Sequence, residues 1–349
     1  TWHGTPIKHL GRDAEDAFVP SANTQRNYFC SDYILSYSPA MTQRTVMAYG
    51  AAAALDRVYE VGTPRIDLTL ATSRARARSI LGAAEDKQVL LYAPTWRGSF
   101  GNQNRDIQEQ VETIEAVLDQ FSDHFDVFVS VHHITAIALK EKGITFRTVP
   151  VDVPINIALA GVDLLISDYS SIAVDYLSLD RPVILYCPDY VHFSETQGLY
   201  DDLRTLPVAF CETIDALMTA VHDARKPSDF ESYAHYHEML VWHEDGHVSA
   251  RALDIILNGV AATAYRRDGR KRILFYAGGM FSNGITSSIV ALTNAIDHDL
   301  YEVSIVFDAL ATDRDVDRQT NIKKLHPACQ FVTRTGAMTY TPEAVSYTH

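Results

Sequence analysis

Long apolar runs and an excess of basic charge are both missing from this 349-residue sequence. No stretch approaches the roughly 20 uninterrupted apolar residues that a helix needs to span a bilayer. The formal net charge of −14 argues against a nucleic-acid-binding protein, which needs a basic face to displace the counterions of the phosphate backbone. The charge is compatible with an anionic substrate, since backbone N–H groups, histidine and arginine can hold a phosphate inside an acidic protein.

Cysteine is scarce, and its spacing excludes two further kinds of site. The four cysteines are far apart and none forms a CxxC pair, so neither a zinc motif nor a dithiol redox motif is supported. We expect buried free thiols in a reducing compartment. Hydrophobic residues make up 47% and charged residues 21% of the chain, which is typical of a globular protein with a sizeable core.

Short apolar segments alternate with helical segments, and this alternation predicts βαβ units with a parallel sheet. Strands this apolar are expected where helices cover both faces of the sheet. The expected strands are residues 89–92, 127–131, 164–167, 182–186 and 208–211. The expected helices are residues 107–121, 155–160, 171–179 and 213–224. The predicted fold class is therefore α/β with a doubly wound parallel sheet.

The same pattern predicts the domain organisation. Residues 75–258 contain all of these elements and are expected to form one complete domain. Residues 1–74 are too short and too rich in loops for a whole α/β domain, so we interpret them as the last part of one. Residues 259–270 are small, polar and basic, as in a linker. A partial third α/β unit, residues 271–349, is expected to follow, with a strand at 272–276, a glycine-rich turn, a helix at 285–296 and a strand at 303–307.

Both ends of the chain suggest a fragment of a longer protein. The chain opens at Thr1 without methionine, inside a candidate motif, and stops at His349 partway through an α/β unit. Residues 345–349 also match an in-frame translation of a common transposon sequencing adapter. We therefore expect the first half of the first domain to be absent.

The strongest candidate site is the segment SDYSS, Ser167 to Ser171, between an expected strand and an expected helix. Ligands of open α/β folds bind at the carboxyl ends of parallel strands. The N–H groups at the start of the helix, with the hydroxyls of Ser170 and Ser171, form a plausible cradle for a pyrophosphate. A plain serine N-cap explains the same residues about equally well.

Three other loops carry candidate side chains. His3, in the opening TWHGTPIK, can take a proton near neutral pH, although a surface histidine in a turn has the same pattern. Arg97, in LYAPTWR, can clamp a phosphate through its guanidinium fork or form a surface ion pair. His132 and His133 follow the second strand, and only one of them would face the ligand edge if both belonged to the strand. No further ligands occur at a suitable spacing, so a metal site is not expected.

Taken together in chain order, the motifs resemble those of the CDP-glycerol glycerophosphotransferase family, of the teichoic acid polymerase and primase type. The matching segments are TWHGTPIK (1–8), VGTPRID (61–67), LYAPTWR (91–97), LISDYSSIAVDYLSLDRPVILYCPD (165–189), GLY (198–200) and DGHVSAR (245–251). The resemblance covers residues 1–258 and implies a GT-B fold, in which two Rossmann-like domains face each other across a cleft. It implies that residues 75–258 bind the nucleotide donor and that residues 1–74 belong to the acceptor-side domain.

The resemblance also implies roles for individual residues. His3 matches the proposed catalytic base of the family, and His132 matches its second histidine better than His133 does. The implied donor-phosphate ligands are Thr95, Arg97, Asp168, Ser170 and Ser171. In the implied reaction His3 takes the proton of an acceptor hydroxyl, the oxygen attacks the β-phosphorus of CDP-glycerol, and CMP leaves. The family implies neither a cofactor nor a metal.

One position departs from the family. An arginine usually precedes Gly198, and this sequence has Gln197, which removes a cation from the expected donor site and leaves the donor open. The alternatives are a GT-B glycosyltransferase that uses a nucleotide sugar, a polyribitol phosphate transferase, and a non-catalytic scaffold in a polymer-assembly complex. Residues from Lys271 onward resemble the start of a second GT-B glycosyltransferase.

The implied partners are CDP-glycerol and a lipid-linked or polymeric polyol phosphate acceptor, with no nucleic acid. The implied location is the cytoplasm, at the inner face of the cell membrane, to which the full-length parent would bind peripherally.

Overall fold

The computed structural model describes residues 4–14, 18–96, 103–259, 265 and 269–335. The chain divides into two compact units. The first comprises residues 1–9, 35–44 and 59–262, and the second comprises residues 10–34, 45–58 and 263–349. All of the family-like segments therefore fall in the first unit.

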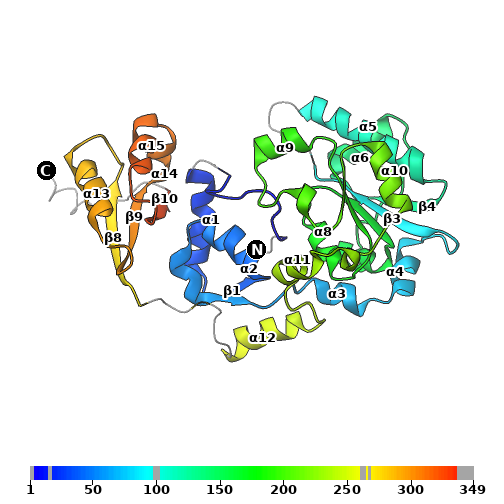
Figure 1. Ribbon diagram of the computed structural model, residues 1–349, viewed down its shortest axis with the longest axis horizontal. Coiled ribbons are helices and arrows are strands. Elements are labelled where there is room, and N and C mark those ends of the chain that lie inside the picture. Colours follow the sequence, from blue (N-terminus) through cyan, green and yellow to red (C-terminus); the bar gives the residue numbers. More distant parts are fainter. Residues whose placement is uncertain (1–3, 15–17, 97–102, 260–264, 266–268, 336–349) are drawn as a thin grey trace. The chain divides into compact units, whose positions relative to one another are not determined.

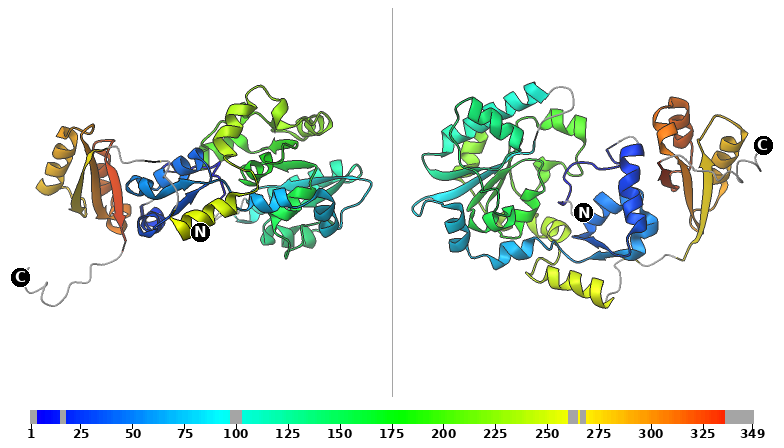
Figure 2. Two further views of the ribbon diagram at one scale, coloured as in Figure 1. Left: turned by 90° about the horizontal axis from the view of Figure 1, so that it is seen from below. Right: turned by 180° about the vertical axis from the view of Figure 1, so that it is seen from behind.

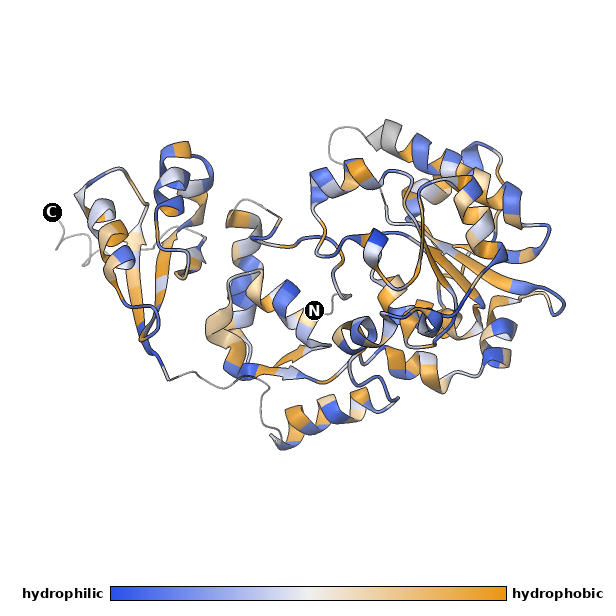
Figure 3. Ribbon diagram, viewed as in Figure 1, coloured by the Kyte–Doolittle hydropathy of each residue, from blue (hydrophilic) through white to orange (hydrophobic). Residues whose placement is uncertain are grey.

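A five-stranded parallel sheet forms the centre of the first unit (Figure 1). Its strands are β3 (Gln88–Ala93), β4 (Phe125–Val129), β5 (Leu164–Ser167), β6 (Val183–Tyr186) and β7 (Ala209–Cys211). Each overlaps one strand expected from the sequence, and the α/β fold class with a doubly wound parallel sheet is confirmed. Figure 3 shows these strands as largely hydrophobic, because neither face of the sheet is left to solvent.

Successive side chains of the strands enter two separate hydrophobic cores, one on each face of the sheet. Leu90 and Ile166 lie in one core, and Leu91 and Leu165 lie in the other. The core around Leu90 is covered by α5 (Gln103–Phe121), α6 (His133–Glu141) and α10 (Ile214–His222). The core around Leu91 is covered by α4 (Arg74–Leu81), α7 (Ile155–Gly161), α8 (Ile172–Leu177), α9 (Tyr190–Gln197) and α11 (Tyr233–Leu240). Figure 2 shows helices on both faces of the sheet.

The strand order β4-β3-β5-β6-β7 places a topological switch point between β3 and β5. The chain leaves β3 for β4 on one side and then returns to β5 on the other side of β3. Ligands of open α/β sheets bind outside the carboxyl ends of the strands at such a point. Ala93 pairs with Ser167 at the ends of β3 and β5, so Thr95 and Asp168 follow directly at the expected binding edge.

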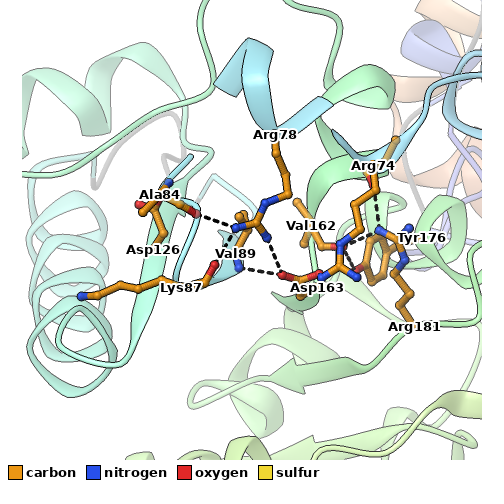
Figure 4. A network of polar contacts seen from close by, with 11 residues as sticks. Arg74, Arg78, Ala84, Lys87, Val89, Asp126, Val162, Asp163, Tyr176 and Arg181 are labelled. Carbon is orange, nitrogen blue, oxygen red and sulfur yellow. Dashed lines mark hydrogen bonds and ion pairs between the residues drawn. The ribbon is translucent and has the colours of Figure 1, made fainter. Parts of the chain in front are cut away.

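A polar network joins the opposite, amino-terminal ends of β3 and β5 (Figure 4). The Asp163 carboxylate accepts hydrogen bonds from Val89 N (2.9 Å) and from the Arg78 guanidinium (3.0 Å), and it forms an ion pair with Arg74. The Tyr176 hydroxyl donates to the carbonyl of the preceding residue, Val162, at 2.9 Å. These contacts fix the sheet at the edge away from the switch point, so we assign them to stability.

The remaining elements of the first unit and its boundary are short. Strands β1 (Ile34–Ser36) and β2 (Val58–Glu60) form a two-stranded sheet. The further helices are α2 (Pro39–Thr42), the π-helix Gln43–Met47, α3 (Ile66–Ala71), α12 (Val248–Asn258), and the 3-10 helices Leu203–Thr205 and Pro227–Asp229. The 3-10 helix Ala52–Arg57 belongs to the second unit. Val61, after β2, packs with Val248 and Ile255 of α12. This small core holds the segment VGTPRID against α12.

The second unit contains a three-stranded parallel sheet with the order β10-β9-β8. Its elements are β8 (Lys271–Gly278), α13 (Gly284–Ala295), β9 (Tyr301–Asp308), α14 (Ala309–Asp313), α15 (Val316–Lys323) and β10 (Gln330–Arg334). Helix α1 (Phe18–Cys30) packs on this sheet, because Asp313 accepts from Phe18 N and Val19 N and the Gln25 amide bonds Phe331 O and Thr333 N. Residues 18–30 and 271–334 thus lie in one compact unit, and the domain boundaries expected from the sequence stay predictions.

Candidate active site

Two loops at the switch point are joined by a buried carboxylate. Asp168, directly after β5, is only 2% exposed. Its carboxylate accepts hydrogen bonds from Thr95 N at 2.8 and 3.0 Å and from Thr95 Oγ1 at 2.6 Å. These bonds connect both carboxylate oxygens of Asp168 to a single residue, Thr95. Asp168 therefore fixes the loop after β3 to the loop after β5.

The serine pair follows Asp168 on the same loop. Ser171 is the residue before α8, and its side chain makes no capping bond to the helix. Ser170 Oγ accepts a long hydrogen bond from Ile172 N at 3.4 Å. Neither serine therefore makes a strong capping bond to α8.

The opening segment of the chain lies against Ser171. A Cβ atom added to Gly4 would lie 1.9 Å from Ser171 Oγ and 2.5 Å from Ser171 Cβ. Both distances are far below van der Waals contact, so only glycine lets the backbone approach this closely. At Gly4 the opening segment therefore lies directly against the serine loop.

A second contact keeps the opening segment in place. His9 N donates to Gly198 O at 3.1 Å, and Tyr200 N donates to Ile7 O at 3.0 Å. Gly198 has a φ of +69°, and a Cβ there would lie 2.3 Å from the His9 ring. The family-like segment GLY thus acts as a short strand partner for residues 7–9. Gln197, where the family usually has arginine, is the exposed last residue of α9.

The two adjacent histidines lie beyond β4, not inside it. His132 is the N-cap of α6, and His133 is the first residue of that helix. The His132 ring lies 4.7 Å from the Trp96 ring and 4.2 Å from the His133 ring, measured between centroids. Side chains alternate between the two faces only along a strand, so this alternation does not prevent both histidines from facing the ligand edge. Trp96 Nε1 is buried and has no hydrogen-bond partner within the described part of the chain.

Behind the serine loop lies a salt bridge that the sequence analysis did not single out. Arg65, in the segment VGTPRID, forms a two-pronged ion pair with Asp175 of α8, at 2.6 and 2.7 Å. It also donates to the hydroxyl of the buried Tyr37 at 3.0 Å. Its guanidinium comes within 3.5 Å of the Cβ position built on Gly4. Arg65 thus joins α8 to the turn that precedes α3, next to the contact between Gly4 and Ser171.

A second acidic side chain lies near this salt bridge. Glu244 accepts a hydrogen bond from Thr63 N at 2.8 Å, and its other oxygen is buried without a partner among the described residues. Burial raises the pKa of Glu244 to about 7, and the Asp175 charge adds to the rise, while Thr63 and Arg65 oppose it. A neutral carboxylic acid explains why one oxygen tolerates the lack of a partner.

Glu244 should make the protein less stable as the pH rises. The folded chain keeps this proton up to about pH 7, whereas the unfolded chain releases it around the ordinary glutamate value of 4.5. The folded state binds more protons in this window, so the free energy of unfolding falls between the two values, by on the order of 3 kcal/mol. Urea unfolding at several pH values should show this fall in the wild type and not in Glu244→Gln.

The exposed Glu238 of α11 provides the control for this measurement. Glu238→Gln should follow the wild-type pH dependence. If the difference between the wild type and Glu244→Gln were the same at acidic and alkaline pH, the raised pKa of Glu244 would be wrong.

The predicted site residues divide into three groups. Thr95 and Asp168 are in direct contact, with Ser170 and Ser171 on the same loop as Asp168. His132 lies beside Trp96, one residue after Thr95. The two remaining predicted residues, His3 and Arg97, lie outside the described residues, and their roles stay predictions.

Sequence reasoning missed several polar residues around the site, and two of them carried a signal. Gln110 interrupts the apolar stripe of α5, where the neighbouring Val111 and Ile114 are buried. Asp175 lies one helical turn after Ser171 in the segment with the strongest motif. A polar residue inside an otherwise buried apolar stripe needs a hydrogen-bond partner, so the sequence pattern itself indicates that the residue takes part in a buried polar contact.

Comparison with known proteins identifies the family of this chain. The family model described as CDP-Glycerol:Poly(glycerophosphate) glycerophosphotransferase matches residues 1–258. The chain belongs to this family. It is therefore an enzyme, a glycerophosphotransferase. The match ends before Lys271, so the resemblance of residues 271–349 to a second glycosyltransferase stays a prediction.

Individual relatives are similar over the same part of the chain. A teichoic acid poly(glycerol phosphate) polymerase of Bacillus spizizenii is 26% identical over 74% of this chain and 68% of its own length. A teichoic acid glycerol-phosphate transferase of Staphylococcus aureus is 29% identical over 73% of this chain and 70% of its own length. The solved structure of the wall teichoic acid polymerase TagF has a TM-score of 0.60 at 22% identity, over 74% of this chain and 67% of that one, and shares the fold.

Among the residues that the structure describes, no helix is long and apolar enough to cross a membrane. In the same residues, no three histidine, cysteine, aspartate or glutamate side chains form a group suited to a metal ion.

Proposed function

We propose that this protein transfers glycerol phosphate from CDP-glycerol to a hydroxyl of a teichoic-acid-like polymer and releases CMP. The observation that carries the proposal is the contact of Gly4 with Ser171. It joins the segment of the proposed base to the loop of the proposed phosphate ligands. This loop lies at the switch point of the sheet, where open α/β folds bind ligands.

The proposed reaction is an in-line displacement at the β-phosphorus of CDP-glycerol. His3 takes the proton of the acceptor hydroxyl, and the acceptor oxygen forms a bond to phosphorus. The bond from the β-phosphorus to the oxygen that bridges both phosphates breaks, and CMP leaves with that electron pair. Positioning and electrostatic stabilisation account for most of the rate in such a transfer.

The donor phosphates would be held by two groups of residues, and two further residues would position the loops that carry them. The hydroxyls and backbone N–H groups of Ser170 and Ser171 contact the pyrophosphate. Arg97 and His132 offset the negative charge that develops on CMP. Thr95 shares its loop with Arg97. Asp168, whose oxygens are occupied by Thr95, acts by holding that loop and not by touching phosphate.

The relatives support the choice of donor and acceptor. Several are named as teichoic acid glycerol-phosphate polymerases or transferases, and a TagF variant was soaked with CDPG. Others are named as ribitol-phosphate polymerases, with 25% and 30% identity. We further propose a lipid-linked or polymeric polyol phosphate as acceptor, and peripheral binding of the longer parent to the inner face of the membrane.

Release of CMP tests the function. The chain, or its full-length parent, is incubated with CDP-glycerol and a glycerol phosphate oligomer, and CMP is quantified by chromatography. We expect CMP to appear with the oligomer and to stay near background without it. Faster turnover of CDP-ribitol or of a nucleotide sugar would contradict the proposed donor, and failure to bind any cytidine diphosphate ligand in calorimetry would favour a scaffold.

A further inference from the structure

A chain of four hydrogen-bonded residues links the segments that follow three neighbouring strands. Asp168, after β5, accepts hydrogen bonds from Thr95, after β3. The Thr95 carbonyl accepts from Gln110 Nε2 at 2.8 Å, and Gln110 Oε1 accepts from Thr135 Oγ1 at 2.9 Å. Thr135 lies in α6, the helix that follows β4. Asp168, Thr95, Gln110 and Thr135 are called the tether here.

The tether is built from buried groups. Gln110 is 6% exposed and Thr135 is fully buried. A carbonyl can only accept, so the Gln110 amide must turn its nitrogen to Thr95 and its oxygen to Thr135. Leucine would make neither bond, and an ionised glutamate could not donate to the Thr95 carbonyl. The position therefore requires a side chain that donates at one end and accepts at the other.

One end of the tether reaches His132. This residue is the N-cap of α6, but its ring accepts only a long bond from Ile134 N, at 3.5 Å. So weak a cap does not hold the first turn of the helix by itself. Thr135, in the same turn, is anchored to Gln110 and through it to the loop of Thr95 and Trp96. The other end of the tether is Asp168, two residues before Ser170.

We propose that Gln110 and Thr135 are positioning residues for glycerol phosphate transfer. They hold His132 at a fixed distance from the loops that carry Thr95 and the serine pair. The inference rests on the proposed function for its kinetic consequence. Displacing a group by about 1 Å in a transfer reaction can cost roughly 100-fold in rate, so a tether of this kind affects turnover beyond stability.

A purely structural role is the alternative. Any buried hydrogen bond stabilises a fold, and a half-satisfied network is costly wherever it lies. A control must therefore lose an equally buried hydroxyl far from the site. Thr69 of α3 is 1% exposed and donates to Asn156 O at 2.9 Å, in the same unit. Thr69→Val and Thr135→Val remove the same group from equally buried positions.

The experiment compares Thr135→Val, Thr135→Ser and Gln110→Leu with Thr69→Val in the whole chain. Melting temperature, kcat and the KM for CDP-glycerol are measured for each. Both valine variants should melt at a similar, lower temperature. Only Thr135→Val and Gln110→Leu should lose kcat, by about tenfold or more, with a smaller change in KM. Thr135→Ser, which keeps the hydroxyl, should retain kcat to within about twofold.

Two results would overturn the proposal. One is a wild-type kcat in both Thr135→Val and Gln110→Leu. The other is an equal loss of kcat in Thr69→Val, which would show a general effect of destabilisation.

A substrate-free measurement separates this inference from the proposed function. In a background with Trp2 and Trp242 replaced by phenylalanine, Trp96 is the remaining tryptophan. The His132 ring lies 4.7 Å from the Trp96 ring, so removal of the imidazole in His132→Ala should change the fluorescence emission of Trp96. Thr135→Val should change this emission in the same direction, and Thr135→Ser should leave it as in the wild type. Wild-type emission in Thr135→Val would refute the tether even if the wild type turned over no CDP-glycerol.

Discussion

His3→Asn should lower the kcat of glycerol phosphate transfer by about 100- to 10,000-fold, the range typical of a lost general base. Asparagine keeps a polar side chain of similar reach but cannot take the proton of the acceptor hydroxyl. The donor phosphates are proposed to bind through Ser170, Ser171 and Arg97, so CDP-glycerol binding should change little. CMP release in single-turnover conditions gives the rate, and calorimetry gives the affinity.

The exposed His124, after α5, offers a matched control. His124→Asn should behave as the wild type in both measurements. The pH dependence adds a second criterion, because the wild-type rate should fall as the base is protonated at acidic pH and the residual rate of His3→Asn should not. A His3→Asn enzyme with near wild-type turnover would exclude this residue as the base.

Gly4→Ala should lower kcat/KM by about 100-fold while leaving the sheet intact. The added Cβ would overlap Ser171 Oγ and Cβ, at 1.9 and 2.5 Å, so the opening segment and the serine loop must move apart. A displacement of about 1 Å between reacting groups is worth roughly this factor. Steady-state kinetics with CDP-glycerol measure the loss, and circular dichroism checks the fold. Gly284→Ala is the control, since a Cβ at Gly284 meets no atom within 4 Å.

A double variant tests the cause of the Gly4→Ala effect. Ser171→Gly removes both atoms that the new methyl group would meet, although it also removes a proposed phosphate ligand. The combination of Gly4→Ala with Ser171→Gly should therefore be no slower than Ser171→Gly alone. Such strong non-additivity is expected only for residues in contact. Additive losses in the double variant would show that Gly4 and Ser171 act separately.

The sheet of the first unit was predictable because its signal is local. Strand β5 has the expected bounds, Leu164–Ser167, because a short apolar run between polar turns leaves little choice of where the strand begins and ends. The expected strand at 127–131 was shifted, and β4 ends at Val129. Ser130 and Val131 extend the apolar pattern without belonging to the strand, and the helix α6 that follows them was not expected. Periodicity alone did not separate the strand end from the first turn of a helix.

Part of the candidate site could be predicted from the sequence for the same reason. Thr95, Asp168 and the serine pair follow strand ends, and parallel strands bring their carboxyl ends to one edge. Arg65 and Glu244 have no such marker, because their importance depends on partners that are far away in sequence. Arg65 pairs with a residue 110 positions later, and Glu244 with a backbone amide 181 positions earlier. No local pattern encodes such pairs.

By itself the sequence determined the fold class, the order of the motifs and the family of this glycerophosphotransferase. Apolar runs and motif residues are properties of short segments, and a short segment keeps them wherever the chain goes. Only the tertiary structure decided that Gly4 meets Ser171, that Asp168 binds Thr95 instead of facing open solvent, and that Gln110 joins the loop after β3 to the helix after β4. These contacts arise when the strand order β4-β3-β5 brings distant loops to one edge, and they depend on atomic distances that only packing fixes.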